Sequence, residues 1–414
     1  MKLAVIGTGI SGLVCAHLLH EEHELTLFEA GAHVGGHTIT SRIDDGDREH
    51  WVDAGFIVYN EVNYPNFVRL LEHLEVETQP TSMSFSVRDD RGDLEYCGTS
   101  INTLFAQRQN LLRPSFLRML ADIARFNKDG KALLDGNGWQ PTLGEFLARG
   151  GYRRELVDQY LVPMTAAIWS TRPEDMFDSP ATFILRFLDN HNLLNARGHH
   201  RWRAIRGGSH RYVQALIRPF RDRIRLNTPV ASLGRDGSGV ELLTAGGDRE
   251  RFDEVIVATH SDQALSMLAE PTAAERQVLG AIRYQPSHAA LHTDESVLPR
   301  RERARASWNF LRPANGNGAL HLTYDMNRLQ TLDARPRFCV SLNMDHRIDP
   351  ARVLRRFDFA HPLFTPPAVA AQRRHAEISG TDRIHYCGAY WGNGFHEDGV
   401  VSALAVTRRF DREL

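Results

Sequence analysis

Three glycines and one acid near the start of the chain have the residue types and spacing that bind a dinucleotide. Gly7, Gly9 and Gly12 make a G-x-G-x-x-G pattern, and Ser11 lies inside it. Gly7 allows a tight turn, Gly9 lets backbone N–H groups approach a pyrophosphate, and Gly12 lets a helix pack closely on a strand. Glu29 follows at about the distance expected for an acid that accepts hydrogen bonds from ribose hydroxyls. These residues predict a dinucleotide site.

Two strands and a helix are needed to hold these residues. Residues 3–6 are an apolar run typical of a short buried strand, and residues 13–19 are apolar enough for a helix packed on a sheet. Residues 24–28 indicate a second strand that ends at Glu29. The N-terminus of the helix would present unpaired N–H groups and the positive end of its dipole to the anion. We therefore interpret the glycines as a nucleotide-binding motif and not as a plain glycine-rich turn.

The composition indicates an ordinary soluble globular protein with more than one domain. The chain has 414 residues, which is too long for one compact core and suits two or three domains. Its hydrophobic content is 42% and its charged content is 24%. The formal net charge of −2 gives no overall basic field for nucleic acid, although residues 197–206 form a short basic stretch. We therefore expect no nucleic-acid partner.

The cysteines and the apolar runs favour a cytoplasmic protein. The four cysteines are far apart and include no C-x-x-C pair, which suits a reducing compartment. Met1 leads straight into the first strand and leaves no room for a signal peptide, and no apolar run is long enough to span a membrane. Residues 199–200 and 396–398 contain metal-ligand types without the spacing of a zinc site, so we expect no metal.

Helical and strand patterns alternate along the rest of the chain. Helical spacing is predicted at 65–75, 100–134, 156–169, 180–194 and 398–410, and Thr142 and Glu145 have the pattern of a helix start. Strands are predicted at 51–59, 84–88, 224–230, 240–243, 252–259, 288–292, 319–324, 337–342 and 384–388. Residues 44–49 are expected at a hairpin tip. The first, middle and last parts of the chain therefore share one nucleotide-binding domain.

One predicted helix carries both apolar and basic side chains. Leucine, isoleucine and phenylalanine recur at helical spacing between residues 111 and 126, and Arg108, Arg113, Arg118 and Arg125 lie among them. This pattern fits a helix that contacts a membrane surface or covers an apolar substrate. It also fits an ordinary domain helix with a solvated basic face.

The sequence resembles the flavin amine oxidase superfamily, which also includes phytoene desaturases and protoporphyrinogen oxidases. The resemblance is carried at the N-terminus by the G-x-G-x-x-G pattern, by Glu29, and by a second group made of Gly35, Gly36 and Thr38. It implies that FAD, and not NAD, is the dinucleotide. His37 stands where the family usually has an arginine that contacts the FAD pyrophosphate, and histidine brings no permanent charge.

The resemblance implies further FAD contacts along the chain. Residues 52–55, ending at Gly55, are similar to the family's segment that passes the flavin. Val230 is similar to the residue whose backbone pairs with adenine in that family. Gly388, Phe395 and Val400 fall in a tail similar to the terminal flavin motif, in which a final helix points its N-terminus at the flavin pyrimidine. A positive helix end there would stabilise negative charge on the reduced flavin.

The resemblance also suggests where substrate would react. Phe395 stands where amine oxidases place one aromatic ring of their substrate cage, and Trp391 is a second candidate ring, although both also suit core packing. Many amine oxidases have a lysine that reaches flavin N5 through a water molecule, and the nearest equivalent here is His288. Phytoene desaturases lack that lysine too. His288 and Tyr59 are our candidates for proton handling, and a structural hydrogen bond is the alternative for each.

The resemblance and the motifs together predict an α/β protein with a Rossmann-type FAD-binding domain and an inserted α+β substrate domain. We expect residues 1–75, 200–285 and 376–414 in the FAD-binding domain, and residues 76–199 and 286–375 in the substrate-binding domain. Residues 307–310 and 326–330 resemble a bacterial subgroup that is similar to flavin desaturases implicated in modified fatty acids.

The expected activity is the transfer of a hydride from a substrate carbon to flavin N5. The leading hypothesis is a desaturase or dehydrogenase acting on a small, apolar, lipid-like molecule with a fatty acyl or isoprenoid chain, with peripheral contact at the inner face of the membrane. A second hypothesis is oxidation of a primary or secondary amine held between Phe395, Trp391 and Tyr390. A third is a flavin-binding scaffold without turnover. The sequence assigns no electron acceptor.

Overall fold

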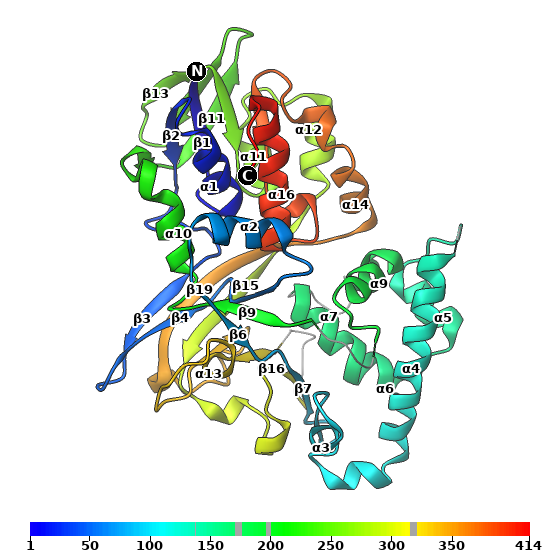
Figure 1. Ribbon diagram of the computed structural model, residues 1–414. Coiled ribbons are helices and arrows are strands. Elements are labelled where there is room, and N and C mark those ends of the chain that lie inside the picture. Colours follow the sequence, from blue (N-terminus) through cyan, green and yellow to red (C-terminus); the bar gives the residue numbers. More distant parts are fainter. Residues whose placement is uncertain (137, 170–175, 196–199, 315–320) are drawn as a thin grey trace.

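The computed structural model describes residues 1–136, 138–169, 176–195, 200–314 and 321–414 (Figure 1). Its upper part is built on a five-stranded parallel sheet with the strand order β10-β2-β1-β14-β20. The strands are β1 (Lys2–Ile6), β2 (Glu24–Phe28), β10 (Ile224–Arg225), β14 (Glu254–Val257) and β20 (Ile384–Tyr386). They come from three separate stretches of sequence, so the predicted Rossmann-type sheet is confirmed.

Each face of this sheet packs against a different layer. Leu3 and Val5 point to a core shared with the helices, whereas Ala4 and Ile6 point to a core on the opposite face. The first layer contains α1 (Ile10–Leu19), α2 (Pro65–His73), α10 (His210–Ile217) and α16 (His396–Thr407). The second contains β11 (Val230–Arg235), β12 (Val240–Thr244), β13 (Arg249–Phe252), α11 (Ser261–Met267) and α12 (Ala273–Gly280).

A seven-stranded sheet forms the lower part of the molecule (Figure 1). In spatial order its strands are β19 (Val353–Pro362), β15 (Tyr284–His292), β18 (Cys339–Leu342), β17 (Leu322–Asp325), β16 (Trp308–Arg312), β7 (Phe85–Asp89) and β8 (Leu94–Cys97). The long antiparallel pair β15 and β19 lies at one edge and runs from this sheet toward the nucleotide-binding part.

Smaller strands link the two parts. The predicted hairpin is present as β3 (Thr40–Asp44) and β4 (Glu49–Asp53), and a three-stranded sheet has the order β5-β9-β6. Its strands are β5 (Val58–Asn60), β9 (Trp202–Ile205) and β6 (Thr78–Thr81). Short helices α13 (Met326–Leu329), α14 (Pro366–Gln372) and α15 (His375–Ile378) complete the connections.

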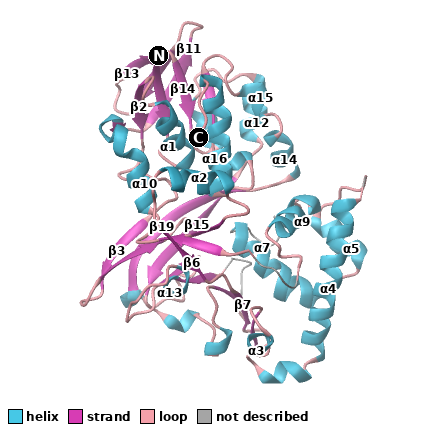
Figure 2. Cartoon of the chain, in the orientation of Figure 1, coloured by secondary structure: helices cyan, strands magenta, loops and turns pink. Residues whose placement is uncertain are grey.

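Helices between β8 and β9 form a lobe of their own beside the large sheet (Figure 2). They are α3 (Ile101–Leu104), α4 (Pro114–Asp135), α5 (Leu143–Gly150), α6 (Arg154–Leu156), α7 (Val162–Trp169) and α9 (Ala181–Asn190). α4 and α9 pack closely, because a Cβ on Gly130 would lie only 2.7 Å from the side chain of Leu185. The predicted capping box at Thr142 and Glu145 is confirmed at the start of α5.

Several predicted elements are divided in the structure, including the strand expected at 51–59, which is split between β4 and β5, and the strand expected at 252–259, which is split between β13 and β14. The single helix expected at 100–134 is α3, a 3-10 turn at Arg108–Leu112 and then α4, because Pro114 starts a helix more readily than it continues one. The helix expected at 156–169 contains a π-turn at Val157–Leu161 before α7, and the strand expected at 224–230 is β10 followed by the start of β11. The predictions at residues 196–199 and 319–320 lie outside the described residues.

No helix in the described part of the chain is both long and apolar enough to cross a membrane.

Candidate functional site

An open cradle lies at the N-terminus of α1. Gly9 is the N-cap residue of this helix, and no side chain caps it. A Cβ on Gly9 would meet nothing within 4 Å, whereas a Cβ on Gly12 would lie 2.1 Å from the carbonyl oxygen of Gly7. Gly36 closes the far side, where a Cβ would lie 2.9 Å from the Gly9 Cα. The unpaired N–H groups of the helix therefore face free space of the kind a pyrophosphate needs.

Glu29 stands at the end of β2, beside this cradle. Its Oε2 accepts a hydrogen bond from the Thr8 backbone N–H at 3.0 Å, and its Oε1 accepts one from the Gly31 N–H at 2.8 Å. Both bonds fix the carboxylate where the ribose acceptor was predicted. The Thr228 N–H donates to the Glu29 carbonyl at 2.9 Å, which sets the start of β11, and thus Val230, next to the same strand end.

Thr38 belongs to a buried network that ties the second glycine pair to α16. Its hydroxyl lies 2.6 Å from the Tyr212 hydroxyl and 3.1 Å from His396 Nε2. The His396 ring also stacks on Phe56, with centroids 3.6 Å apart. Burial lowers the pKa of His396 to about 3, so this imidazole is neutral. Sequence reasoning missed His396, although it stands one position after Phe395.

The starts of α1 and α16 touch each other. The Ser11 hydroxyl donates a 2.9 Å hydrogen bond to the Gly399 carbonyl, and Val400 is fully buried between the two helices. Gly388, at the end of β20, donates its N–H to the Ser402 hydroxyl at 3.0 Å. The FAD contacts predicted from the first and last parts of the sequence are thus brought together.

Three histidine rings gather beside Gly55. The His37 ring lies 5.8 Å from that of His260 and 5.6 Å from that of His361, measured between centroids. Burial, with smaller contributions from the other histidines, lowers the pKa of His37 to about 3, and burial lowers that of His361 to about 4. The position where the related family usually has an arginine is therefore lined by neutral rings that can form hydrogen bonds but carry no charge.

One face of the β15–β19 pair points at this group. Phe359 lies 5.1 Å from His37 between ring centroids, and a Cβ on Gly55 would lie 3.5 Å from its ring. Ser287 pairs with Phe359 and Gln285 pairs with His361, so their side chains share that face. Ser287 Oγ, Gln285 Oε1 and His361 Nδ1 are buried polar atoms without a hydrogen-bond partner among the described residues. Such atoms indicate a ligand that would satisfy them.

The structure does not bring His288 into this group. His288 pairs with Asp358 on the opposite face of the same strands, and its Nδ1 lies 2.6 Å from the Asp358 carboxylate. Its side chain is 65% exposed. Adjacent residues of a strand point to opposite faces, so Ser287, and not His288, shares the face of Phe359 and the histidine group.

Two other predicted residues pack elsewhere. Tyr59 is buried in the core under α2, where its ring lies 5.4 Å from that of Phe67 between centroids. Trp391 packs 4.6 Å from the ring of His375, on the side of α14 and α15. Among the described residues, neither ring pairs directly with that of Phe395 or with those of His37, His260 and His361. The structure therefore does not place Tyr59 and Trp391 with the residues that line the site.

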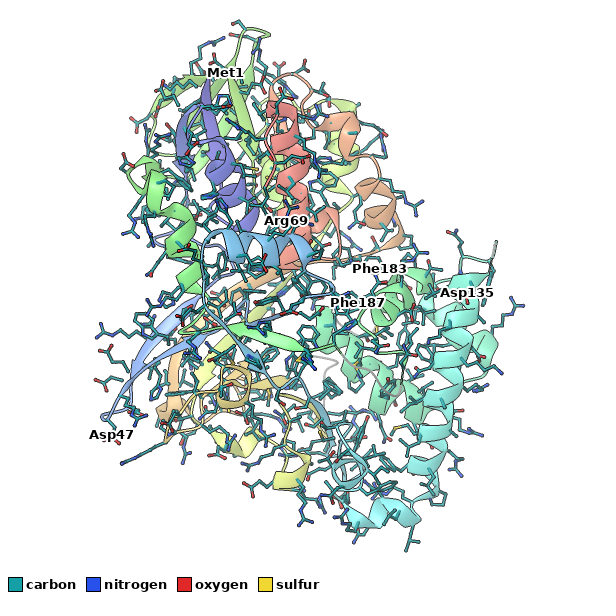
Figure 3. All side chains as sticks on the ribbon, viewed as in Figure 1. Met1, Asp47, Arg69, Asp135, Phe183 and Phe187 are labelled. Atoms are coloured by element: carbon teal, nitrogen blue, oxygen red, sulfur yellow. The ribbon has the colours of Figure 1, made fainter. Side chains whose placement is uncertain are left out.

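Phe395 instead takes part in an aromatic wall between the helical lobe and α16. Its ring lies 5.1 Å from that of Phe187, and Phe183 lies 4.9 Å from Phe364, measured between centroids. Figure 3 shows Phe183 and Phe187 where α9 approaches the nucleotide-binding part. Beyond Phe187 the rings of His191 and then Trp202 extend the wall. The i, i+4, i+8 spacing of residues 183, 187 and 191 was the available signal.

The aromatic wall carries no charged side chain among these six residues. Burial lowers the pKa of its one titratable member, His191, to about 4, so that ring is neutral. The Phe395 N–H donates to the Asp398 carboxylate at 2.9 Å, which caps the start of α16 and holds the ring in place. Phe187 and Phe364 belong to the hydrophobic core of the helical lobe, and Phe183 and Phe395 pack against that core.

Asp53 ties the two parts of the molecule together behind the site. It is fully buried, and it accepts hydrogen bonds from the Ser209 N–H at 2.9 Å and from Gln330 Nε2 at 2.9 Å. The Thr40 hydroxyl donates to it as well. Burial raises the pKa of Asp53 to about 7. The carboxylate fixes the hairpin that leads to Gly55 and the turn at Gly207 and Gly208 that precedes Ser209.

No lysine stands on β15. The chain has three lysines, Lys2, Lys128 and Lys131. Lys2 lies 4.8 Å from the Phe252 ring centroid at the start of β1, and the other two belong to α4, where Lys131 donates to Asn195 at 2.6 Å. None is positioned like the N5-directed lysine of many amine oxidases.

The residues present fit FAD. The open helix N-terminus at Gly9 suits a pyrophosphate, Glu29 suits a ribose, and the unpartnered atoms of Gln285, Ser287 and His361 suit a polar ligand edge. The N-terminal end of α16 adds a positive dipole end on the same side.

Comparison with known proteins gives a consistent family. The model of the flavin containing amine oxidoreductase family matches residues 10–336. "Putative flavin-containing monoamine oxidase AofH" of Mycobacterium tuberculosis (strain ATCC 25618 / H37Rv) is 24% identical over 265 residues, which are 60% of this chain and 55% of that protein. The chain thus spans about half the length of the curated relatives it matches.

Two solved structures have the same fold over nearly the whole chain. Cyclohexylamine oxidase from Brevibacterium oxydans IH-35A is 16% identical with a TM-score of 0.68, and covers 99% of both chains. The CLA-producing fatty acid isomerase from P. acnes is 14% identical with a TM-score of 0.69, over 99% of this chain and 98% of that one. With the match of the family model to most of the sequence, this chain belongs to the flavin-containing amine oxidoreductase family, a family of FAD-dependent oxidoreductases.

Proposed function

We propose that the protein removes a hydride from a carbon atom of an apolar, lipid-like molecule, and so acts as a desaturase or dehydrogenase on a fatty acyl or isoprenoid chain. The observation that carries this proposal is the aromatic wall, whose six side chains include no charge. Such a wall binds a hydrocarbon chain by burying it from water. Bound FAD supplies the chemistry by accepting the hydride, while the second hydrogen leaves the substrate as a proton.

The protein's own residues position the reactants. In this proposal the aromatic wall from Phe183 to Phe395 holds the hydrocarbon chain of the substrate and excludes water. The hydrogen bond between Ser11 and Gly399 holds the N-terminal end of α16 in place. Ser287 and Gln285 offer polar groups on the face of β15 that points toward Gly55. We propose no proton-handling role for His288, because its exposed side chain is paired with Asp358 on the opposite face.

The second candidate is oxidation of an amine. It is favoured by the resemblance to AofH and to cyclohexylamine oxidase, and by aromatic rings that could hold a neutral amine. The absence of a lysine on β15 makes this mechanism less suitable here, since the three lysines of the chain lie on β1 and α4. Membership of an oxidoreductase family disfavours a scaffold without turnover.

Anaerobic mixing of the FAD-loaded protein with candidate substrates tests the proposal. Oleoyl and methyl-branched acyl phospholipids, free fatty acids and a carotenoid precursor form one set, and benzylamine, cyclohexylamine and putrescine form the other. We expect loss of the absorbance of oxidised flavin with a member of the first set. Bleaching by amines alone would overturn the lipid proposal and establish the second candidate. The electron acceptor can then be identified by reoxidation with oxygen or with a quinone.

A further inference from the structure

Apolar side chains are exposed together at one end of the helical lobe. Ile101 is 80% exposed, Leu111 52%, Leu112 88% and Leu117 43%. These four are among ten exposed large hydrophobic residues in the described part of the chain, and they fall within 17 consecutive positions. We call this group the apolar tip. The α3 region that carries it lies at the end of the molecule farthest from the N-terminus in Figure 1.

The backbone that carries the apolar tip is held in place from inside. Leu111 and Leu112 end a 3-10 turn whose Asn110 is fully buried, and Phe116 of α4 is fully buried behind them. Phe116 packs against the ring of Phe105, with centroids 5.8 Å apart. The exposed leucines therefore project from a packed support. Exposing several large apolar side chains from such a support costs free energy unless a partner covers them.

Only basic side chains accompany the apolar tip. The sequence from 96 to 121 contains Arg108, Arg113 and Arg118 and no aspartate or glutamate. Arg108 donates to the Phe105 carbonyl at 2.9 Å, which holds its guanidinium at the surface, and Arg113 donates to backbone carbonyls. None of the three has a carboxylate partner among the described residues. The patch thus combines exposed apolar groups with unneutralised positive charge.

The nearest acids in the fold do not cancel this charge. Asp93 and Glu95 precede the segment and face Arg300 and Arg301 of a neighbouring turn, and the buried Asp122, which follows the segment, pairs with Arg125 and Arg153. Glu302 is the one acid in the run from 300 to 305, which contains four arginines. This turn packs beside α3, and three of its arginines, Arg300, Arg301 and Arg305, are already paired with Asp93, Glu95 and Glu295, so the free positive charge at the apolar tip comes from Arg108, Arg113 and Arg118.

We propose that the apolar tip is a docking surface for an anionic lipid bilayer. Leu111, Leu112 and Ile101 would enter the boundary between headgroups and acyl chains, while Arg108 and Arg118 would contact lipid phosphates. Charge complementarity selects an anionic bilayer over a second copy of this chain, whose own tip would bring like charges together. The inference rests on the proposed function for its purpose, because a lipid-like substrate would be met at such a surface.

The helical lobe connects the apolar tip with the aromatic wall. α4 starts at the tip and runs the length of the lobe to Asp135, which Figure 3 labels at the far end from α3. Along this path it packs against α9 through Gly130 and Leu185. α9 carries Phe183 and Phe187 of the wall. Docking through the tip would therefore place the lobe that contributes half of the wall directly on the membrane.

Flotation with lipid vesicles tests this inference without reference to turnover. The FAD-loaded protein is mixed with vesicles of pure phosphatidylcholine, or of phosphatidylcholine with one third phosphatidylglycerol, and the partition coefficient is measured. L111S/L112S removes two exposed leucines, and R108Q/R118Q removes two charges. L226S/L354S is the matched control, since these leucines are 38% and 40% exposed elsewhere on the surface. Circular dichroism and flavin absorbance verify that each variant is folded and loaded.

We expect the wild type and L226S/L354S to bind anionic vesicles equally. L111S/L112S should bind about 10-fold or more weakly. R108Q/R118Q should bind anionic vesicles about 10-fold more weakly than the wild type and neutral vesicles almost as well. Added salt should weaken the binding of the wild type to anionic vesicles in the same way. Equal binding by the wild type and L111S/L112S, or no binding by the wild type, would overturn the inference. A dimer that L111S/L112S converts to a monomer, without vesicle binding, would assign the tip to a second copy. None of these results depends on flavin bleaching, so failure of the docking inference can be distinguished from failure of the proposed function.

Discussion

The rings of Phe187 and Phe395 stack with centroids 5.1 Å apart and planes inclined by 21°, although one belongs to α9 and the other directly precedes α16. This contact joins the helical lobe to the nucleotide-binding part at the place where substrate would meet the flavin. Phe395 packs against both of the hydrophobic cores that meet there. The pair therefore fixes the helical lobe against the start of the C-terminal helix.

We predict that F187A lowers kcat/KM for the best apolar substrate by about 10-fold or more, because the hydrocarbon loses an aromatic contact. F187L keeps an apolar side chain and should retain most of the activity. Phe187 is 5% exposed, so thermal unfolding must show that the alanine variant is folded under the assay conditions. An unchanged kcat/KM in a folded, FAD-loaded F187A would contradict a role for the wall in substrate binding.

A second prediction separates FAD binding from folding in the glycine motif. A Cβ at Gly9 has open space, so G9A should leave the Tm of the apoprotein unchanged while weakening FAD binding about 10-fold or more. A Cβ at Gly12 would meet the Gly7 carbonyl at 2.1 Å, so G12A should destabilise the fold by about 2 kcal/mol or more. Differential scanning fluorimetry of the apoproteins and titration with FAD measure both. Equal losses of Tm would show that the cradle at Gly9 is not free.

A third prediction compares the two faces of β15. S287A removes a buried hydroxyl without a described protein partner and should weaken FAD binding about 2- to 10-fold, because one hydrogen bond to the ligand is lost. H288A removes an exposed side chain paired with Asp358 and should change neither FAD affinity nor kcat/KM. Fluorescence titration and the flavin absorbance maxima report the difference. A larger effect of H288A than of S287A would contradict this prediction and support the role expected for His288 from the sequence.

The fourth prediction concerns pH. Burial raises the pKa of Asp53 to about 7, whereas the pKa of an aspartate in an unfolded chain is about 3.9. The folded protein therefore binds more protons than the unfolded chain between these values, and the contribution of Asp53 to the free energy of unfolding falls as the pH rises through this window. The stability of the wild type minus that of D53N should decrease from about pH 4 to about pH 7. Urea unfolding at several pH values measures it, and a constant or increasing difference would contradict the buried titration.

Much of the nucleotide-binding part could be predicted because its constraints are local. A strand, a turn with positive φ at Gly7 and a helix follow one another within 20 residues, and each is visible in the residue types. The acid at Glu29 ends its strand as expected. The tail from Gly388 to Val400 could be placed only through its resemblance to a family, because its contact with Ser11 spans 388 positions.

The substrate side was harder to predict because it depends on strand register and helix packing. The titratable ring of His288 favours this residue in the sequence, yet the pairing of Ser287 with Phe359 turns Ser287 toward the histidine group. The histidines at 260 and 361 come from different elements and meet His37 only in the folded chain. Pro114 is the residue that divides the long helical pattern, because proline starts a helix more readily than it continues one.

The hydrogen bond between Ser11 and Gly399 has a consequence for biosynthesis. The cradle at the start of α1 emerges early from the ribosome, whereas α16, which Ser11 of α1 contacts, is translated nearly 400 residues later. A nascent chain that has formed β1 and α1 would have an incomplete FAD site and an exposed apolar face on α1 until α16 is synthesised and packs against it. FAD capture is therefore expected to follow synthesis of α16, and the supply of free cofactor at that moment would govern how much newly made chain reaches its final state.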